Sequence, residues 1–260
     1  MKPVDFAAFV NQLATMSGQV ILPFFRSQIT AEDKSRGGVF DPVTEADRAG
    51  ETAMRRLIRE TFPDHGVVGE EFGAERPHAE FVWVLDPIDG TRAFMAGLPL
   101  WGTLIGLTRD GLPAYGLMHQ PFIGERFFGD GGSAGYTGPH GARTLMTRRC
   151  RSLADAVLST TSPRLFAEDE LAAYERVEGA VKLTRYGYDC YAYCMLAAGH
   201  VDIIVEAGLK PYDIVALIPI IEGAGGIVTS WDGGSAAAGG SIVACGDKRL
   251  HGEVLERLRG

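Results

Sequence analysis

Hydrophobic residues recur every three or four positions near the start of the chain, a pattern typical of an amphipathic helix packed on a core. This spacing covers residues 5–25, and Pro23 is expected to bend the last turn. Residues 35–43 are rich in turn formers, and a second helix is expected to begin at Thr44, a preferred capping residue, and to end near residue 62.

Short apolar runs separated by Gly, Pro and Asp fill residues 66–130 and predict the strands of a substantial sheet. Residues 130–142, DGGSAGYTGPHGA, are expected to form a loop or hairpin tip. From about residue 150 the predicted strands and helices alternate. The expected fold is α+β, with two closely packed αβ lobes and a site between them. In the second half, strands are expected at 157–161, 201–207, 226–231 and 241–246, and helices at 166–178, 188–200, 213–225 and the C-terminus.

Composition narrows the class of protein. A chain of 260 residues with 46% hydrophobic content can bury one large core or two packed lobes. The formal charge of -8 argues against a general affinity for nucleic acid or anionic membranes. The four cysteines lack zinc-site spacing and are interpreted as reduced packing residues. Without a signal sequence or a long apolar run, a cytoplasmic enzyme is expected.

Four acidic stretches stand beside Gly or Pro at predicted element boundaries, where side chains can converge on a cleft. A single Asp or Glu is usually a solvated surface group, and Asp, Pro and Gly are ordinary turn formers. If the four stretches converge, however, their mutual repulsion is relieved by divalent cations, and all-oxygen ligands select Mg²⁺, Mn²⁺ or Ca²⁺. The stretches are DPVTEAD (41–47), VVGEEFG (67–73), DPIDGT (86–91) and KPYDIVA (210–216), and the converging carboxylates are Glu70, Asp86, Asp89 and Asp213.

The stretch DPIDGT follows an apolar strand and combines two kinds of ligand. Asp86 and Asp89 can approach one ion across a turn stiffened by Pro87, and the carbonyl of Ile88 can add an oxygen. Gly90 and Thr91 then present backbone amides at a helix start, where partial positive charge suits phosphate. The stretch therefore predicts a combined metal and phosphate site.

The blocks GEE, WVLDPIDGT and YDIVALIPIIEGAGG, with DPVTEAD upstream, resemble the inositol monophosphatase family over roughly residues 5–255. The resemblance implies a layered αβαβα sandwich, a homodimer, and lithium-sensitive hydrolysis of a small phosphate monoester. It implies two or three Mg²⁺ ions, with Mn²⁺ as a substitute. The N-terminal lobe, 1–150, would carry most ligands and the C-terminal lobe, 151–260, would carry Asp213 and the specificity residues. The matching metal-ligand positions are Glu70, Asp86, Ile88, Asp89 and Asp213.

The same resemblance implies roles for the groups around the metals. Glu70 and Thr91 match groups near the nucleophilic water, and Asp47 matches the carboxylate that orients the threonine. Gly90 and Thr91 match the phosphate-binding amides. In such enzymes bound metals activate water and stabilise the leaving oxygen, so no Cys or His nucleophile is required.

The segment RYGYDCYAYCMLAAGHVDIIVEAGLKPYD (185–213) is more similar to the histidinol-phosphatase branch of this superfamily than to the inositol phosphatases. Histidinol phosphate carries an ammonium group and an imidazole, so its recognition needs acceptors beyond the metal site. Asp189 and Glu206 are placed to supply them. The alternative for Asp189 is a charge at the N-terminus of a helix, and the alternative for Glu206 is a surface charge at the end of a strand. Arg92 is expected to pair with Asp189 or to contact phosphate. His119 stands where an acidic residue is expected in many similar histidinol-phosphatases, so contacts to the leaving group there stay open.

Other readings remain open at this stage. Inositol-1-phosphate, fructose-1,6-bisphosphate, a 3′-phosphonucleotide or several sugar phosphates are alternative substrates. A noncatalytic phosphate- or metal-binding module is the alternative from another class. That module would be expected to lose its activating groups, whereas Glu70, Thr91, Asp47 and Asp213 are all present.

Overall fold

Two helices at the N-terminus match the predicted spacing. The computed structural model describes residues 6–27, 32–33 and 42–260. Helix α1 (Phe6–Ile21) continues into a short 3₁₀ turn with Pro23 near its start, as expected from the proline. Helix α2 (Glu45–Thr61) begins directly after Thr44, whose backbone N–H donates to Asp47 Oδ2 at 2.8 Å. Most of the segment predicted to be turn-rich lies outside the described residues.

An eight-stranded sheet follows, in the order β10-β9-β8-β7-β6-β5-β3-β4. β3 runs parallel to β5, and the other neighbouring strands are antiparallel. Its interior strand β5 is buried along almost its whole length because helices cover both faces of the sheet. The strands are β3 (Gly66–Gly69), β4 (Gly73–Glu75), β5 (Phe81–Asp89), β6 (Gly102–Arg109), β7 (Leu112–Gln120), β8 (Glu125–Gly129), β9 (Ala134–Gly138) and β10 (Gly141–Thr144). A two-stranded ribbon, β1 (Glu32–Asp33) with β2 (Pro42–Val43), stands apart.

The second half of the chain forms a five-stranded sheet in the order β12-β11-β13-β15-β14. Its strands are β11 (Val157–Thr160), β12 (Leu183–Tyr186), β13 (Ile203–Leu209), β14 (Ile227–Ser230) and β15 (Gly240–Cys245). The helices after α2 are α3 (Thr91–Met95), α4 (Glu168–Glu178), α5 (Asp189–Ala197), α6 (Pro211–Ile214), α7 (Leu217–Gly223) and α8 (Lys248–Arg259).

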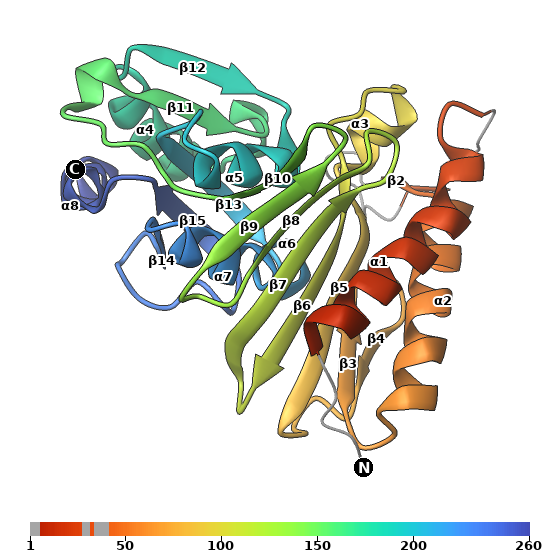
Figure 1. Cartoon of the computed structure of the whole chain (residues 1–260). Coiled ribbons are helices and arrows are strands. Elements are labelled where there is room, and N and C mark those ends of the chain that lie inside the picture. Colours follow the sequence, from red (N-terminus) through yellow and green to blue (C-terminus); the bar gives the residue numbers. More distant parts are fainter. Residues whose placement is uncertain (1–5, 28–31, 34–41) are drawn as a thin grey trace.

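The elements stack in five layers, which confirms the expected αβαβα sandwich (Figure 1). Helices α1 and α2 lie side by side on the outer face of the large sheet, and α5, α6 and α7 lie between the two sheets. Helices α4 and α8 cover the far face of the small sheet. Separate apolar clusters fill the spaces between layers, so the two sheets are held at fixed positions about the central helices.

Residues 130–142, expected to be a loop or hairpin tip, contain β9, the turn of the β9–β10 hairpin and the first two residues of β10, so the hairpin tip is present and is longer than expected. Two other features differ from the predictions. Strand β12 was not predicted. The single helix expected over 213–225 is divided into α6 and α7. Next to this division, a β-carbon on Gly116 of β7 would lie 1.8 Å from the Ala216 carbonyl oxygen, so sheet and helix backbones approach closely there.

Candidate active site

A pocket of about 190 Å³ gathers acidic side chains from both halves of the chain. Six carboxyl groups line it, together with a single guanidinium, that of Arg92. All the acidic residues that the sequence proposed as metal ligands or substrate contacts reach this pocket. The lining residues are Glu70, Asp86, Ile88, Asp89, Gly90, Thr91, Arg92, Thr161, Leu165, Asp189, Glu206, Ala207, Leu209 and Asp213.

The stretch predicted as a turn at 86–89 is the irregular end of β5. The strand runs on to Asp89, but its register with β6 shifts between Asp86 and Asp89. Asp86 Oδ1 accepts the backbone N–H of Ile88 at 3.0 Å, and the Thr103 hydroxyl donates to the Pro87 carbonyl at 2.8 Å. The bulge therefore lets both aspartates line one pocket from the same strand.

Gly90 ends this strand with a backbone conformation that requires glycine. Its φ is +91°, and a β-carbon there would lie 2.8 Å from the Leu100 carbonyl oxygen. Helix α3 then begins at Thr91, whose hydroxyl donates to the Ile88 carbonyl at 3.0 Å. The helix start predicted from Gly-Thr is thus present, and it forms part of the pocket wall.

Asp47 lies behind the pocket, buried at the start of α2. Its Oδ2 atom accepts hydrogen bonds from both the backbone N–H and the hydroxyl of Thr44. Its negative charge is one of those that raise the pKa of Asp86. Asp47 therefore acts on the pocket electrostatically, although it is not among the lining residues.

Asp213 enters the pocket from the C-terminal half of the chain. It lies in α6, where Pro211 occupies the first helical position, and its Oδ2 accepts the Lys210 N–H at 2.6 Å. Helix α6 packs against β5, the strand that carries Asp86 and Asp89. This packing brings carboxylates separated by more than a hundred residues in sequence into one cavity.

Glu206 and Asp189 line the pocket on its C-terminal side. Glu206 of β13 is 3% exposed, and its Oε1 accepts the backbone N–H of Thr161 at 2.5 Å and the Thr161 hydroxyl at 2.9 Å. Burial raises the pKa of Glu206 to about 8, although these hydrogen bonds act to lower it. The reading of Glu206 as a strand-end surface charge is therefore wrong. Thr161, at the end of a predicted strand, is a pocket residue that the sequence did not single out.

Asp189 is the first residue of α5 and has a φ of +44°, a conformation uncommon for a residue with a side chain. Burial raises the pKa of Asp189 to about 6, while the positive charge of Arg92 and a hydrogen bond from Thr161 oppose the rise. The charge of Arg92 therefore favours the ionised form of Asp189, and direct pairing of the two side chains stays a prediction. The strained backbone directs an acid into the pocket.

The electrostatics of the pocket fit divalent cations. Burial, and then the charge of Glu70, raise the pKa of Asp86 well above its ordinary value; burial, and then Asp189, do the same for Asp89. So many carboxyl groups around one guanidinium need further positive charge to ionise together, and hard oxygen ligands suit Mg²⁺. Among the described residues, no three His, Cys, Asp or Glu side chains already have a metal-holding geometry.

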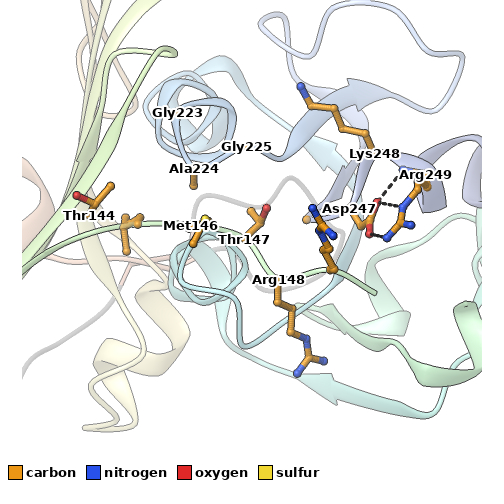
Figure 2. A pocket seen from close by; sticks show the side chains of 13 residues that line it. Thr144, Met146, Thr147, Arg148, Gly223, Ala224, Gly225, Asp247, Lys248 and Arg249 are labelled. Atoms are coloured by element: carbon orange, nitrogen blue, oxygen red, sulfur yellow. Dashed lines mark hydrogen bonds and ion pairs between the residues drawn. The ribbon is translucent and has the colours of Figure 1, made fainter. Parts of the chain in front are cut away.

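A larger cavity of about 780 Å³ lies elsewhere and lacks this chemistry (Figure 2). It lies beside the end of α7 and the start of α8. Its basic side chains are partly neutralised, because Arg249 pairs with Asp247 and Arg148 pairs with the buried Asp202. We therefore place the candidate active site at the smaller acidic pocket.

Several other expectations concern residues outside the pocket. His119 is buried in β7, where its Nδ1 lies 3.1 Å from the Glu125 carbonyl oxygen, and it does not line the pocket. Trp83 and Trp101 are fully buried in the core. All four cysteines are buried and free, which agrees with their interpretation as packing residues.

The five-layer fold and the acidic pocket match those expected for the αβαβα class of metal-dependent phosphatases. The sequence profile of the inositol monophosphatase family matches residues 2–260, and the chain belongs to this family. The bifunctional phosphatase IMPL2, chloroplastic, of Arabidopsis thaliana is 45% identical over 97% of this chain and 75% of that protein. A histidinol-phosphatase of Mycobacterium tuberculosis is 38% identical over 84% of each chain.

Solved structures agree with the assignment of the fold. An inositol monophosphatase from Zymomonas mobilis superposes with a TM-score of 0.86 over 96% of both chains, at 40% identity. Enzymes of this family depend on metal ions, generally Mg²⁺. No helix in the described part of the chain is long and apolar enough to cross a membrane.

Proposed function

We propose that this enzyme hydrolyses L-histidinol phosphate to L-histidinol and phosphate, a step of histidine biosynthesis. The observation that carries the proposal is the presence of two further carboxyl groups, those of the buried Glu206 and the partly buried Asp189, in the same pocket as the expected metal ligands. A neutral polyol does not require these additional acids, whereas an ammonium group or an imidazolium ring pairs with them. The similarity to a histidinol-phosphatase supports the same substrate.

The proposed mechanism assigns the metal site to carboxylates from both halves of the chain. Glu70, Asp86, Asp89 and Asp213, with the carbonyl of Ile88, would hold Mg²⁺ in the pocket that they line. Mg²⁺ held there would neutralise the phosphate, lower the pKa of a bound water and stabilise the leaving oxygen.

The chain's own groups then position the phosphate and the water. The backbone amides of Gly90 and Thr91 would bind phosphate oxygens at the start of α3. The Thr91 hydroxyl donates its hydrogen to the Ile88 carbonyl, which leaves its lone pairs for a proton of the attacking water. Glu70 would take one proton from the water as it attacks phosphorus, and this proton would pass to the leaving oxygen, so that the alcohol is released. Asp47, the carboxylate expected to orient Thr91, would act on the site through its charge, because the Thr91 hydroxyl already donates its hydrogen to Ile88.

Asp189 and Glu206 would bind the cationic part of the substrate. An incoming ammonium group favours the ionised form of both acids, which burial alone disfavours. Arg92 would balance Asp189 at the mouth of the pocket, where its own side chain is exposed. Specificity thus depends on charges that make no contact with the phosphate.

Inositol-1-phosphate, or a range of sugar phosphates, is the alternative substrate. The inositol monophosphatase of Zymomonas mobilis and the histidinol-phosphatase of Mycobacterium tuberculosis have similar sequence identity to this chain, 40% and 38%. The experiment therefore includes both substrates. Both alternatives use the same metal site and differ only in the leaving group.

The test is phosphate release by the purified protein with Mg²⁺, comparing kcat/KM for L-histidinol phosphate and inositol-1-phosphate beside a metal-free control. We expect a preference of about 100-fold or more for histidinol phosphate, equivalent to roughly 2.7 kcal/mol of transition-state binding. Equal values, or a preference for inositol phosphate, would overturn the substrate assignment. The family resemblance also leads us to propose a homodimer, which light scattering of the same sample would measure.

A further inference from the structure

A buried ion pair stands behind the turn that carries Glu70. Glu51 and Arg55 lie one helical turn apart in α2, and Arg55 Nε donates to Glu51 Oε1 at 2.6 Å. The Glu51 side chain is 0% exposed and that of Arg55 is 5% exposed. Replacing a buried ion pair of this kind by apolar residues is often neutral or stabilising, so stability alone does not explain the pair.

The Glu51 carboxylate binds the backbone of the turn between β3 and β4. The N–H of Glu71 donates to Oε2 at 2.7 Å, and the N–H of Phe72 donates to Oε1 at 3.2 Å. Arg55 completes the arrangement by donating through Nη2 to the Gly73 carbonyl. One acid and one base of α2 therefore fix three consecutive residues, two in the turn and the first residue of β4.

Glu70 directly precedes these residues and is held from its other side by β5. Its backbone N–H donates to the Leu85 carbonyl at 3.2 Å, and Leu85 directly precedes Asp86. The position of Glu70 relative to Asp86 is thus set by one hydrogen bond to β5 and by the hydrogen bonds of Glu51 to the next two amides.

The end of β3 is shaped to receive the Glu51 carboxylate. A β-carbon on Gly69 would lie 2.1 Å from Glu51 Oε1 and 2.4 Å from Glu51 Cδ. Gly69 is paired with Leu85 in the parallel register of β3 and β5, so its backbone cannot move away without breaking the sheet. The close approach shows that the carboxylate packs directly against the chain just before Glu70.

We propose that Glu51, held by Arg55, is a positioning residue that fixes the turn bearing Glu70 and thereby preorganises the metal site. The inference rests on the proposed function, since it assumes that Glu70 binds Mg²⁺ in a phosphatase. Glu51 does not line the pocket and acts only through the backbone of the turn. Outer groups that orient ligands in this way are worth about 10- to 100-fold in metal affinity.

The test is Glu51→Gln, which keeps the size of the side chain. The carboxylate accepts from Glu71, Phe72 and Arg55. The amide replaces one acceptor by a donor, so that an N–H of the turn or of Arg55 faces another N–H. We expect the Mg²⁺ concentration that gives half of the metal-induced rise in Tm to increase about 10- to 100-fold. At saturating Mg²⁺, kcat is expected to fall while KM for the ester stays unchanged.

Asp202→Asn is the matched control. Asp202 is also a buried acid that binds an arginine and a backbone amide, with Arg148 Nε and the Val157 N–H both at 2.7 Å, and it lies outside the pocket. We expect this variant to lose Tm without any change in Mg²⁺ dependence. If Glu51→Gln also lowers Tm but keeps the wild-type Mg²⁺ dependence and kcat, Glu51 is only structural and the inference is overturned.

A second variant and a measurement on the wild type complete the test. Should Glu51→Gln fail to fold, Arg55→Lys keeps the positive charge but removes the fork that joins Glu51 to Gly73, and it must shift the Mg²⁺ dependence in the same direction. Wild-type protein whose Tm does not respond to Mg²⁺, and which releases no phosphate, would refute the proposed function itself. A responsive wild type with an equally responsive Glu51→Gln refutes only the role of Glu51.

Discussion

Thr161 donates two hydrogen bonds to one oxygen of Glu206, from its backbone N–H at 2.5 Å and from its hydroxyl at 2.9 Å. The Thr160 hydroxyl donates to the other oxygen at 3.2 Å. These donors favour the ionised carboxylate, whereas burial raises its pKa. Thr160 and Thr161, at the end of β11, therefore orient the carboxylate of Glu206 in β13 toward the pocket.

Thr161→Val should weaken recognition of a cationic substrate. Valine keeps the shape of the side chain and the backbone N–H but removes the hydroxyl donor, and a hydrogen bond to a charged group contributes about 1.5–3 kcal/mol. We expect kcat/KM for histidinol phosphate to fall about 10-fold or more while that for a small neutral phosphate ester is unchanged. Steady-state kinetics on both esters would measure it, and Thr161→Ser, which keeps the hydroxyl, is the control.

Asp189→Asn should separate substrate recognition from chemistry. The amide keeps the size of the side chain and the left-handed backbone, in which asparagine is well tolerated, but removes the negative charge. KM for histidinol phosphate is expected to rise about 10-fold or more, with much smaller changes for a generic phosphate ester. An equal loss on both substrates would count against a role for Asp189 in binding the cation.

Glu70→Gln should abolish most activity without unfolding the protein. The proposed mechanism needs this carboxylate both for the metal and for a proton of the attacking water, so we expect kcat to fall about 100-fold or more. Chelation of Mg²⁺ should reduce wild-type activity to a similar extent. Glu80→Gln, at an exposed ion pair with Arg109, is the control and should be nearly silent. Undiminished activity in Glu70→Gln would contradict the mechanism.

The sequence identified Glu70, Asp86, Asp89 and Asp213 because each lies in a stretch with Gly or Pro at the end of an element, where a side chain is free to face a cleft. Asp189 and Glu206 were identified through the resemblance of residues 185–213 to histidinol-phosphatases. The sequence did not identify Thr161 or Glu51, because their roles arise from contacts with segments far away in sequence. Glu51 did leave a signal, since it falls among buried positions on one face of α2, between Asp47 and Met54. The positive φ of Asp189 left none, because no local residue pattern requires it.

The packing of α7 on the large sheet gives a test of the fold that is independent of the site. A β-carbon on Gly116 would lie 1.8 Å from the Ala216 carbonyl oxygen, a backbone atom, so Gly116→Ala should destabilise the protein by about 2 kcal/mol or more. Gly252 lies inside α8 with open space around it, so Gly252→Ala should stabilise by roughly 0.5–1 kcal/mol. Unfolding in urea would measure both changes, and similar effects from the two substitutions would contradict this packing.

His119 should make the stability of the protein fall as the pH is lowered through the weakly acidic range. Burial lowers the pKa of His119 from 6.5 to about 4, with a smaller contribution from the charge of Arg126, while the hydrogen bond to the Glu125 carbonyl opposes the shift. The unfolded chain therefore binds a proton between pH 6.5 and 4 that the folded chain does not, so the unfolded state gains stability as the pH falls across this window.

His119→Asn isolates this effect, because the asparagine amide can still donate to the Glu125 carbonyl but does not titrate. The packing around the ring is tight, since a β-carbon on Gly18 of α1 would lie 3.0 Å from His119 Nε2, and the variant is expected to be less stable at neutral pH. From pH 7 to pH 5, however, the wild type should lose about 2 kcal/mol more than the variant. Urea unfolding at both pH values measures the difference, and parallel losses in the two proteins would show that His119 is protonated without cost in the fold.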